Sequence, residues 1–581
     1  MRVDTLIQDA WVYQTVRRIF EKKQVYLLNG KIYYVASKLD DTLIPQNTIQ
    51  AENQYLIPGL IDIHMHIESS MTTPEIFSQT VLPYGVTTVV ADAHEMANVF
   101  GIEGLRAFFD CDTTLDIFQA IPSSVPSTKP ELETTGGQIG LSEVAELLTW
   151  PKMICLGEAM DFKGIAYEKE SLIRKIIDLC RQTKPTMPIE GHIPKIYKRE
   201  LADFLASGIT SDHTHQFAEH LIEKMEAGLF IELQEKSLTK EVVECLNDYQ
   251  LMDHACVVTD DVMADRLQTG HLNRLVQLLI KLGMRVEDAI YMATFTPARR
   301  MQFSDRGRIA PGMIADLILL NSIDDWQVTQ VIKSGQSVYS DNQVSVPLIQ
   351  QQFPEHFYRS LQCRPLTKED CQIKVKTDKN HVRCRVIERE AIGTFTLLST
   401  QNFLVKDIQL QLDSENYCYL FVQERYTHSN RLAKQIIKQK FTTKGCIATT
   451  WAHDHHNILL MGNDSESIVC AQKRLLELQG GYVVVKEGKV VAECPLLIGG
   501  IVSQEPIVTL GAKLGAVRTA MNDLGYTHTN EIMSFSTLSL PVSPAYKVTD
   551  RGLLETKTQQ FLAVVLEEDG VILDEESIDL Q

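Results

Sequence analysis

The sequence predicts an α/β protein organised around a (β/α)8 barrel, and three observations support this fold class. Eight apolar, strand-like runs occur between residues 58 and 304, and amphipathic helical segments separate them. Residues of metal-ligand type close five of these runs. Shorter strand-like pieces and turns precede and follow the alternating region, and a separate α+β region begins near residue 365.

The elements are expected in the following order. The first residues, MRVDTLIQDAWVYQTVRRIF, have helix-like periodicity, and Asn29-Gly30 between QVYLL and KIYYVAS predicts a β-hairpin. The barrel strands are expected in GLIDIHMH, GVTTVVADAH, LDIFQAIPSS, KMICLGEA, TMPIEGH, GITSDHTH, GLFIELQE and HACVVTDD. Strands are expected again in the stretch that begins DRGRIAPGMIADLILL, and later in RCRVIER and GYVVVKEGKVVAEC.

Length and composition indicate an ordinary globular protein. The 581 residues suggest about three or four domains of roughly 150 residues each. Hydrophobic residues make up 44% of the chain and charged residues 23%, which is enough for large cores. The formal net charge is −19, so the chain offers no basic face to a phosphate backbone and nucleic acid is not an expected partner.

The sequence gives no sign of export or of membrane insertion. The N-terminus has neither an uninterrupted apolar segment nor a small-residue cleavage site, so no signal peptide is expected. No stretch approaches the ~20 apolar residues that a membrane span requires. The 12 cysteines show no CxxC pair or regular spacing, which is typical of reduced thiols in a cytoplasmic protein.

Polar residues at the ends of the predicted strands indicate a metal site. In a parallel barrel the carboxyl ends of the strands converge on one mouth. Strand alternation points residues i and i+2 to the same side, so both histidines of an HxH pair can reach one ion. Imidazole and carboxylate ligands suit Zn, Mn or Fe(II) without distinguishing among them. The candidate ligands, in chain order, are His64, His66, Glu158, His192, His213 and Asp260.

Each of these residues also has a simpler interpretation. A lone histidine is more often a core or surface residue than a ligand, and Asp260 could be the N-cap of the helix expected in DVMADRLQTGHL. HxH pairs also occur by chance, and this chain holds a second one, His213 and His215. The order HxH, Glu, His, His, Asp along separate apolar runs favours the metal site.

Several long motifs resemble the bacterial adenine deaminase family of the amidohydrolase superfamily. They are PGLIDIHMHIESSMTTP, GVTTVVADAHEMANV, LGEAMD, GHIP, SDHT, VVTDDVMADRLQTGHLNRLV, ATFTPARRMQFSDRGRIAPGMIADLILL, WAHDHHNILLMG and LSLPVSPAYKVTDRGL. The resemblance implies a small β-domain from residues 1–57 and 305–362, the barrel over 58–304, and an adenine-deaminase-type C-terminal domain over 363–581.

The resemblance also implies a chemistry. The six candidate ligands would hold a binuclear centre, with Mn2+ as the first expectation and Fe2+ or Zn2+ as alternatives. Glu158 would bridge the ions or shuttle protons, and Asp260 would bind metal and act as general base and acid. Hydroxide generated on the metal would attack C6 of adenine, and the products would be hypoxanthine and ammonia.

Other positions match the family motifs with less defined roles. Some could line the pocket and recognise the purine edge, although Asp92 and Glu95 could equally cap the helix in MANVFGIEGLRAFF. These substrate-binding candidates are Glu68, Ser69, Asp92, His94, Glu95 and Thr214. The WAHDHHN motif, with His453, Asp454, His456 and Asn457, could reach the active site or only hold its own domain together.

Two departures from the family pattern leave the substrate open. Thr214 stands where many members have glutamate, and Ala93 stands where most have proline. Adenine deamination is the leading hypothesis. A hydrolase acting on another modified purine or a cyclic amide is the second, and a non-catalytic metal-binding homologue is the third. The expected partners are a small-molecule purine and another copy of the chain, with neither nucleic acid nor membrane.

Overall fold

The eight apolar runs are all strands in the computed structural model, which describes every residue except 567 and 574–581. Described residues fall into two compact units. Unit 1 comprises residues 1–93, 108–123 and 140–351, and unit 2 comprises residues 94–107, 124–139 and 352–581. The eight strands, all in unit 1, are β6 (Leu60–Met65), β7 (Val86–Ala91), β8 (Asp116–Ile121), β9 (Met153–Ala159), β10 (Ile189–Gly191), β11 (Ser211–Asp212), β12 (Phe230–Leu233) and β13 (Ala255–Val257).

These strands pair in chain order and in parallel. One sheet has the order β10-β9-β8-β7-β6, and a second has the order β11-β12-β13. Hydrogen bonds join the two sheets at both ends: Thr210 N donates to Ile189 O at 3.0 Å, and Asp260 N donates to His64 O at 3.1 Å. Side chains of successive strands, such as Ile61, Val90 and Cys256, form one buried core.

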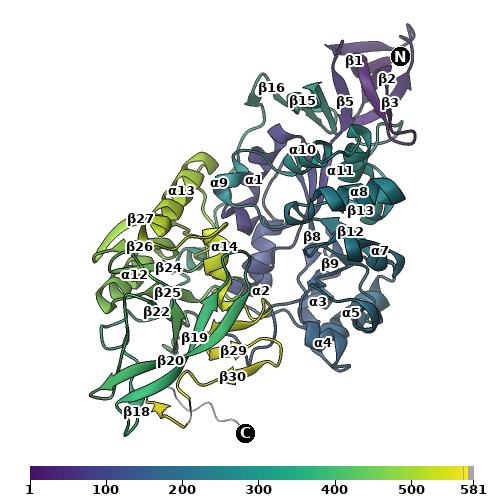
Figure 1. Cartoon of the computed structure of the whole chain (residues 1–581). Helices are drawn as coiled ribbons and strands as arrows, with labels where there is room; N and C mark the ends of the chain where they lie inside the picture. Colours follow the sequence, from purple (N-terminus) through teal and green to yellow (C-terminus); the bar gives the residue numbers. More distant parts are fainter. Residues whose placement is uncertain (567, 574–581) are drawn as a thin grey trace. The chain divides into compact units, whose positions relative to one another are not determined.

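Helices connect consecutive parallel strands. Figure 1 shows α7 and α8 beside β12 and β13, and α11 packs on β6 and β13. An amphipathic helix between parallel strands covers the sheet, which is why most residues of these strands are buried. The helices of unit 1 are α1 (Pro74–Val81), α3 (Leu141–Leu147), α4 (Phe162–Ala166), α5 (Leu172–Thr183), α6 (Lys198–Leu205), α7 (Ala218–Glu226), α8 (Lys240–Tyr249), α9 (Ala264–Leu267), α10 (Leu272–Lys281) and α11 (Val286–Arg300).

A nine-stranded sheet combines the segments before and after the parallel strands. Its order is β17-β16-β15-β14-β5-β1-β2-β3, and β4 pairs with β1. β14 pairs with β5 with Leu317 opposite Pro58, so the two segments share one sheet. The strands are β1 (Arg2–Gln14), β2 (Ile19–Leu28), β3 (Lys31–Ala36), β4 (Ile44–Gln50), β5 (Tyr55–Pro58), β14 (Leu317–Ser322), β15 (Gln327–Lys333), β16 (Gln336–Ser340) and β17 (Gln343–Val344).

The N-terminal prediction was half right. Asn29-Gly30 forms the β2–β3 turn, with φ of 50° and 75° at these residues, which confirms the hairpin. The helix-like periodicity of the first residues was misleading, because Arg2–Gln14 is strand β1. A bulge between Ile7 and Ala10 shifts its register, and it is buried on both faces, so its apolar residues do not alternate.

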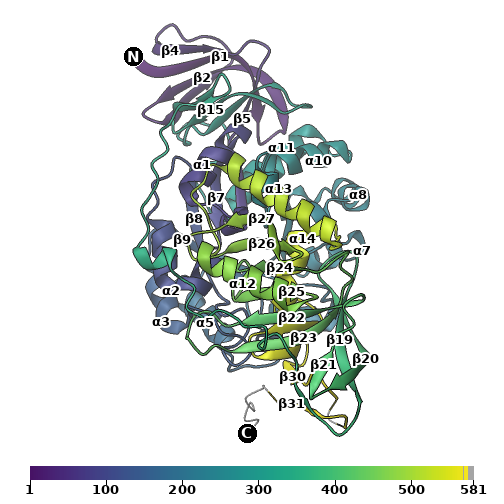
Figure 2. The same cartoon turned by 90° about the vertical axis from the view of Figure 1, so that its left-hand side faces the viewer.

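Unit 2 is built on a second nine-stranded sheet, of order β21-β20-β19-β23-β22-β25-β24-β26-β27. Figure 2 shows α12 and α13 along this sheet, and both pack against β26 and β27. The strands are β18 (Val375–Lys376), β19 (His381–Arg389), β20 (Thr396–Lys406), β21 (Gln409–Gln411), β22 (Tyr417–Gln423), β23 (Leu432–Lys438), β24 (Gly445–Thr449), β25 (Ile458–Gly462), β26 (Gly481–Lys486), β27 (Lys489–Pro495), β28 (Tyr546–Thr549), β29 (Gly552–Glu555), β30 (Gln560–Leu562) and β31 (Val571–Ile572). The helices are α2 (His94–Phe109), whose last two residues belong to unit 1, α12 (Ser465–Leu478), α13 (Ile507–Leu524) and α14 (Glu531–Ser536).

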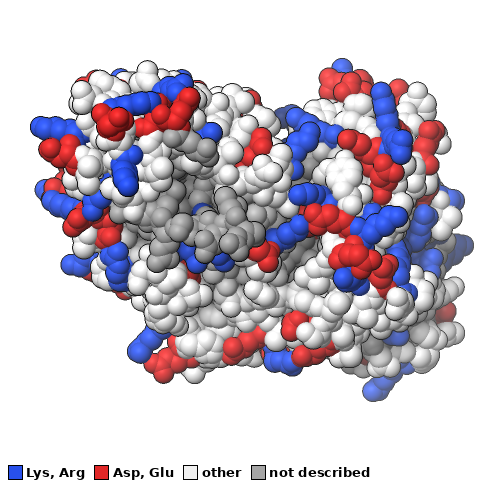
Figure 3. Space-filling model, turned by 90° about the horizontal axis from the view of Figure 1, so that it is seen from below, with Lys and Arg blue, Asp and Glu red and all other residues white. Residues whose placement is uncertain are grey.

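Within the described part of the chain, no helix combines the length and apolar character needed to cross a membrane. On the face shown in Figure 3, lysine and arginine side chains are interspersed with aspartate and glutamate.

A buried lysine links the two sheet systems of unit 1. Lys333 Nζ, at the end of β15, lies 2.8 Å from Asp316 Oδ2 and 2.7 Å from Asp116 Oδ2 on β8. Arg306 Nη1 also contacts Asp116, at 2.6 Å. Burial raises the pKa of Asp316, and the nearby Lys333 ammonium opposes this effect. The lysine therefore stabilises the ionised form of the Asp316 carboxylate.

We predict that Lys333→Met destabilises unit 1 by about 3–5 kcal/mol, because the substitution leaves Asp316 buried without its cation. Chemical denaturation followed by circular dichroism measures the loss. Lys240→Met is the matched control: Lys240 pairs with Glu244 on the surface, so its loss should cost less than about 1 kcal/mol. Equal shifts for the two variants would contradict the prediction.

Candidate metal centre

The six residues predicted as metal ligands come together at the carboxyl ends of the parallel strands of unit 1. His64 is the next-to-last residue of β6, His66 directly follows that strand, and Glu158 is the next-to-last residue of β9. His192 and His213 directly follow β10 and β11, and Asp260 follows β13. The chain folds them together because each stands at the same end of a parallel strand.

Glu158 stands between two groups of histidines. Its Oε2 lies 2.8 Å from His192 Nδ1 and 3.0 Å from His213 Nε2. Its Oε1 lies 3.4 Å from His66 Nε2. One carboxylate therefore faces two clusters of nitrogen donors, one with each oxygen.

Asp260 completes the second cluster. Its Oδ1 lies 3.3 Å from His66 Nε2 and 3.8 Å from His64 Nε2. These separations match those between ligands about 2.0–2.2 Å from a common ion. Glu158 thus belongs to two potential ligand groups, one with His64 and His66 and one with His192 and His213.

The chemistry of the donors fits divalent metal ions. His64 Nε2 is buried and has no hydrogen-bond partner among the described residues, which would be costly unless an ion filled the role. Burial lowers the pKa of His64 to about 3, so its imidazole is neutral, as a metal ligand must be. Burial alone would raise the pKa of Asp260, but its hydrogen bond to His66 and the nearby histidines lower it, so the carboxylate is ionised.

Hydrogen bonds hold the ligands in place. His66 Nδ1 donates to Asp92 O at 2.9 Å, which leaves Nε2 facing the cluster. Asp92 Oδ2 accepts from Glu158 N at 3.2 Å. Gly157 permits this close approach, because a Cβ there would lie 2.1 Å from Asp92 Oδ2. Asp92 therefore supports two of the candidate ligands, and its contact with substrate stays a prediction.

Comparison with known proteins identifies the family. A model described as Amidohydrolase family matches residues 55–338, and one described as Adenine deaminase C-terminal domain matches residues 394–560. A protein named Adenine deaminase 2 from Oenococcus oeni is 47% identical over 566 residues, 97% of this chain and 99% of the relative. The chain belongs to the adenine deaminase family. Adenine deaminases from Clostridium perfringens (45% identity, 96% of this chain, 98% of the relative) and Lactobacillus delbrueckii subsp. bulgaricus (43%, 97% and 99%) are also similar.

In this member of the adenine deaminase family, Thr214 belongs to a buried network behind the ligands. Its hydroxyl donates to Asp212 Oδ1 at 2.9 Å and lies 3.1 Å from Ile193 O. Asp212 Oδ2 contacts Lys224 Nζ at 2.5 Å, and both side chains are buried. The network fixes Asp212 and Thr214, the two neighbours of His213 in the chain. Its hydrogen bonds satisfy the Thr214 hydroxyl within the protein.

The remaining predicted substrate-binding residues lie in different units. Glu68 and Ser69 are buried in unit 1, where Ser69 Oγ donates to Asp261 Oδ1 at 2.5 Å. His94 and Glu95 belong to unit 2, at the start of α2, and both contact residues of the WAHDHHN motif. The Glu95 carboxylate contacts His456, a histidine more than 350 residues away in the sequence.

The sequence interpretation missed two residues of the centre. Gln234 follows β12 and donates from Nε2 to Asp260 Oδ2, which fixes the orientation of the carboxylate. Glu232, on β12, is buried and lies within potential ligand distance of His64 and His213. Their run, GLFIELQE, ends in polar residues as the other runs do, and that signal could have identified both.

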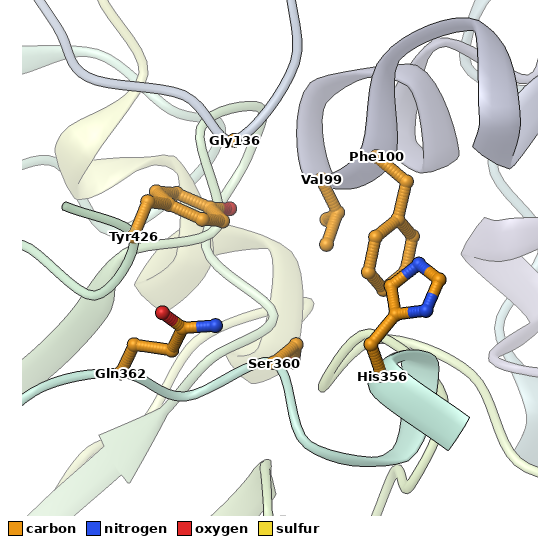
Figure 4. Close-up of a pocket in the computed structure, with 7 residues that line it drawn as sticks. All are labelled: Val99, Phe100, Gly136, His356, Ser360, Gln362 and Tyr426. Carbon is orange, nitrogen blue, oxygen red and sulfur yellow. The ribbon is translucent and has the colours of Figure 1, made fainter. Parts of the chain in front are cut away.

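Unit 2 contains a separate cavity of about 180 Å³. Figure 4 shows the Tyr426 ring on one side of it and the Phe100 and His356 rings on the other. Ser360 Oγ and Tyr426 Oη, on its wall, accept hydrogen bonds from the buried Arg425. None of the described residues that line the cavity was predicted from the sequence as a site residue.

We predict that Thr214→Val destabilises the protein by about 1–3 kcal/mol, because Asp212 loses a hydrogen-bond donor in a buried site. Thr214→Ser keeps the hydroxyl and is the matched control, with a midpoint of denaturation close to that of the wild type. Denaturant titration of both variants checks the difference. A valine variant as stable as the serine variant would show that the hydrogen bond contributes nothing.

Proposed function

We propose that this protein is an adenine deaminase that hydrolyses adenine to hypoxanthine and ammonia. The observation that carries the proposal is the full-length similarity to proteins named adenine deaminases, up to 47% identity over 97% of the chain among those compared. The six clustered donors of unit 1 support it, since they supply the ligands that such a metal-dependent hydrolase requires.

We further propose the architecture and the cofactor. The eight parallel strands close into a (β/α)8 barrel over 58–304, residues 1–57 and 305–362 make the small β-domain, and 363–581 form the adenine-deaminase-type domain. The two donor groups that share Glu158 support a binuclear centre. Mn2+ is the proposed metal, with Fe2+ or Zn2+ as alternatives, because imidazole and carboxylate ligands suit all three.

The chain's own residues then have defined tasks. Divalent ions bound by these donors would act as Lewis acids and lower the pKa of water toward ~7, which supplies the nucleophile for C6 of adenine. Glu158 belongs to both donor groups and holds the histidines of each in position. Asp260 accepts the proton of the attacking water and returns protons to the ring nitrogen and the departing ammonia. Gln234 keeps the Asp260 carboxylate in one orientation for these transfers.

The conformation of Asp260 supports its assignment. Its φ of 56° is in the left-handed region, which is uncommon for a residue other than glycine. Such conformations persist where the surroundings impose them, and they concentrate at functional sites. Here the backbone hydrogen bond to His64 O and the side-chain bond from Gln234 impose it.

Among the described residues, no structural feature favours the two other hypotheses. The case for a different purine or cyclic amide was that Thr214 replaces a glutamate, and the Thr214 hydroxyl is bound to Asp212. A non-catalytic homologue would have no use for an ionised Asp260 fixed by Gln234. We propose a cytoplasmic enzyme with a small-molecule purine as its partner, without nucleic acid or membrane; self-association stays a prediction.

We predict that Asp260→Asn in the Mn2+-loaded protein lowers kcat for adenine by about 10²–10⁴-fold, because the proton acceptor is lost. Absorbance spectroscopy follows the conversion to hypoxanthine, and elemental analysis checks that the variant still binds metal. Asp248→Asn, on the exposed face of α8, is the matched control and should keep wild-type turnover.

Two outcomes would overturn parts of the proposal. Full activity of the Asp260→Asn variant would exclude Asp260 as the base. A metal-loaded wild-type protein that leaves adenine unchanged but releases ammonia from another purine or a cyclic amide would transfer the function to that substrate.

A further inference from the structure

The WAHDHHN motif forms a buried cluster with the start of α2 in unit 2. The motif lies between β24 and β25, and α2 begins at His94. Contacts between the two segments join residues more than 350 positions apart. The cluster consists of His94, Glu95, His453, Asp454 and His456, each at most 5% exposed.

Four of these side chains direct donor atoms toward one another. Glu95 Oε1 is in direct contact with His453 Nδ1 and lies 3.8 Å from His94 Nε2. Asp454 Oδ1 lies 3.3 Å from His453 Nδ1 and 4.0 Å from His94 Nε2. Most of these spacings resemble those in the barrel-strand cluster, where His66 and His64 lie 3.3 and 3.8 Å from Asp260 Oδ1.

His456 holds the glutamate from the other side. Its Nε2 contacts Glu95 Oε2, so both oxygens of the carboxylate face imidazoles. His456 Nδ1 and Asp454 Oδ2 are buried without a hydrogen-bond partner among the described residues. A buried cluster with such atoms is incomplete as a hydrogen-bond network.

The charge balance of the cluster is unfavourable without a cation. Glu95 and Asp454 are both buried, and two buried carboxylates need about two positive charges nearby. A divalent ion would neutralise both carboxylates and let every imidazole remain neutral.

We propose that His94, Glu95, His453 and Asp454 bind a divalent transition-metal ion in unit 2, in addition to the ions of the proposed deaminase centre. Two imidazoles and two carboxylates form a four-donor set of the kind that binds Zn2+ tetrahedrally. Mg2+ and Ca2+ prefer oxygen ligands alone, so the histidines favour a transition metal. The ion would tie α2 to the β24–β25 connection, and this inference does not depend on the substrate of the enzyme.

Metal analysis of the full-length protein tests the proposal. The protein is stripped with a chelator, equilibrated with Zn2+ and freed of excess metal before elemental analysis. Asp454→Asn and His453→Gln should each reduce bound Zn2+ by about one ion per chain. The matched control is His455→Gln, in the same motif: His455 Nδ1 accepts from Asn457 N at 2.9 Å and takes no part in the cluster. It should bind as much Zn2+ as the wild type.

A paired variant separates this site from the deaminase centre. His64→Gln with His66→Gln should lower the Zn2+ content independently, and combining it with Asp454→Asn should lower the content further by about one ion per chain. A zinc content unchanged by Asp454→Asn and His453→Gln in folded proteins would overturn the proposal, whatever the activity on adenine.

Crystallography gives a test that needs no variant. Anomalous scattering at the zinc edge from Zn2+-soaked wild-type crystals should show a peak about 2.0–2.3 Å from donor atoms of Glu95 and His453. The absence of a peak there, with zinc present at His64 and His66, would overturn the proposal.

Discussion

The burial of carboxylates at the ends of parallel strands is the constraint on which the rest of unit 1 depends. A buried carboxylate costs several kcal/mol unless cations or hydrogen-bond donors surround it. Here adjacent strands and helices supply the partners. Thr259 Oγ1 donates to Asp62 Oδ2 at 2.6 Å, Lys224 pairs with Asp212, and the Glu158 backbone donates to Asp92. Strand order thus provides both the ligands and the residues that hold them.

The sequence was sufficient to predict the parallel strands and the six candidate ligands that meet at their ends, because both follow from local rules. An apolar run of strand length marks a buried strand, and a polar residue at its end marks the mouth. The same rules failed for β1, where a bulge and burial on both faces remove the alternation that identifies a strand. They also gave no role to Gln234 or Glu232, although the run that holds both ends in polar residues as the other runs do.

The remaining features depend on contacts that no local pattern records. Thr214 was predicted to contact substrate because it stands beside His213, and the sequence did not show that its hydroxyl would also bind Asp212. Glu95 had two interpretations from the sequence, a pocket residue and a helix cap, and neither indicated its contacts with His453 and His456 from a distant part of the chain. Each motif could be found in the sequence, but the contact between the two motifs could be seen only in the folded structure.

The nine-stranded sheet of unit 1 has a consequence for biosynthesis. Strand β5 ends at Pro58, and its partner β14 begins at Leu317, so the N-terminal strands leave the ribosome long before their sheet can be completed. At roughly 5–20 residues per second, this delay is about 13–50 s. During that time the edge of β5 is available to other nascent chains. Chaperones that shield early strand edges should therefore matter more for this protein than its final stability suggests.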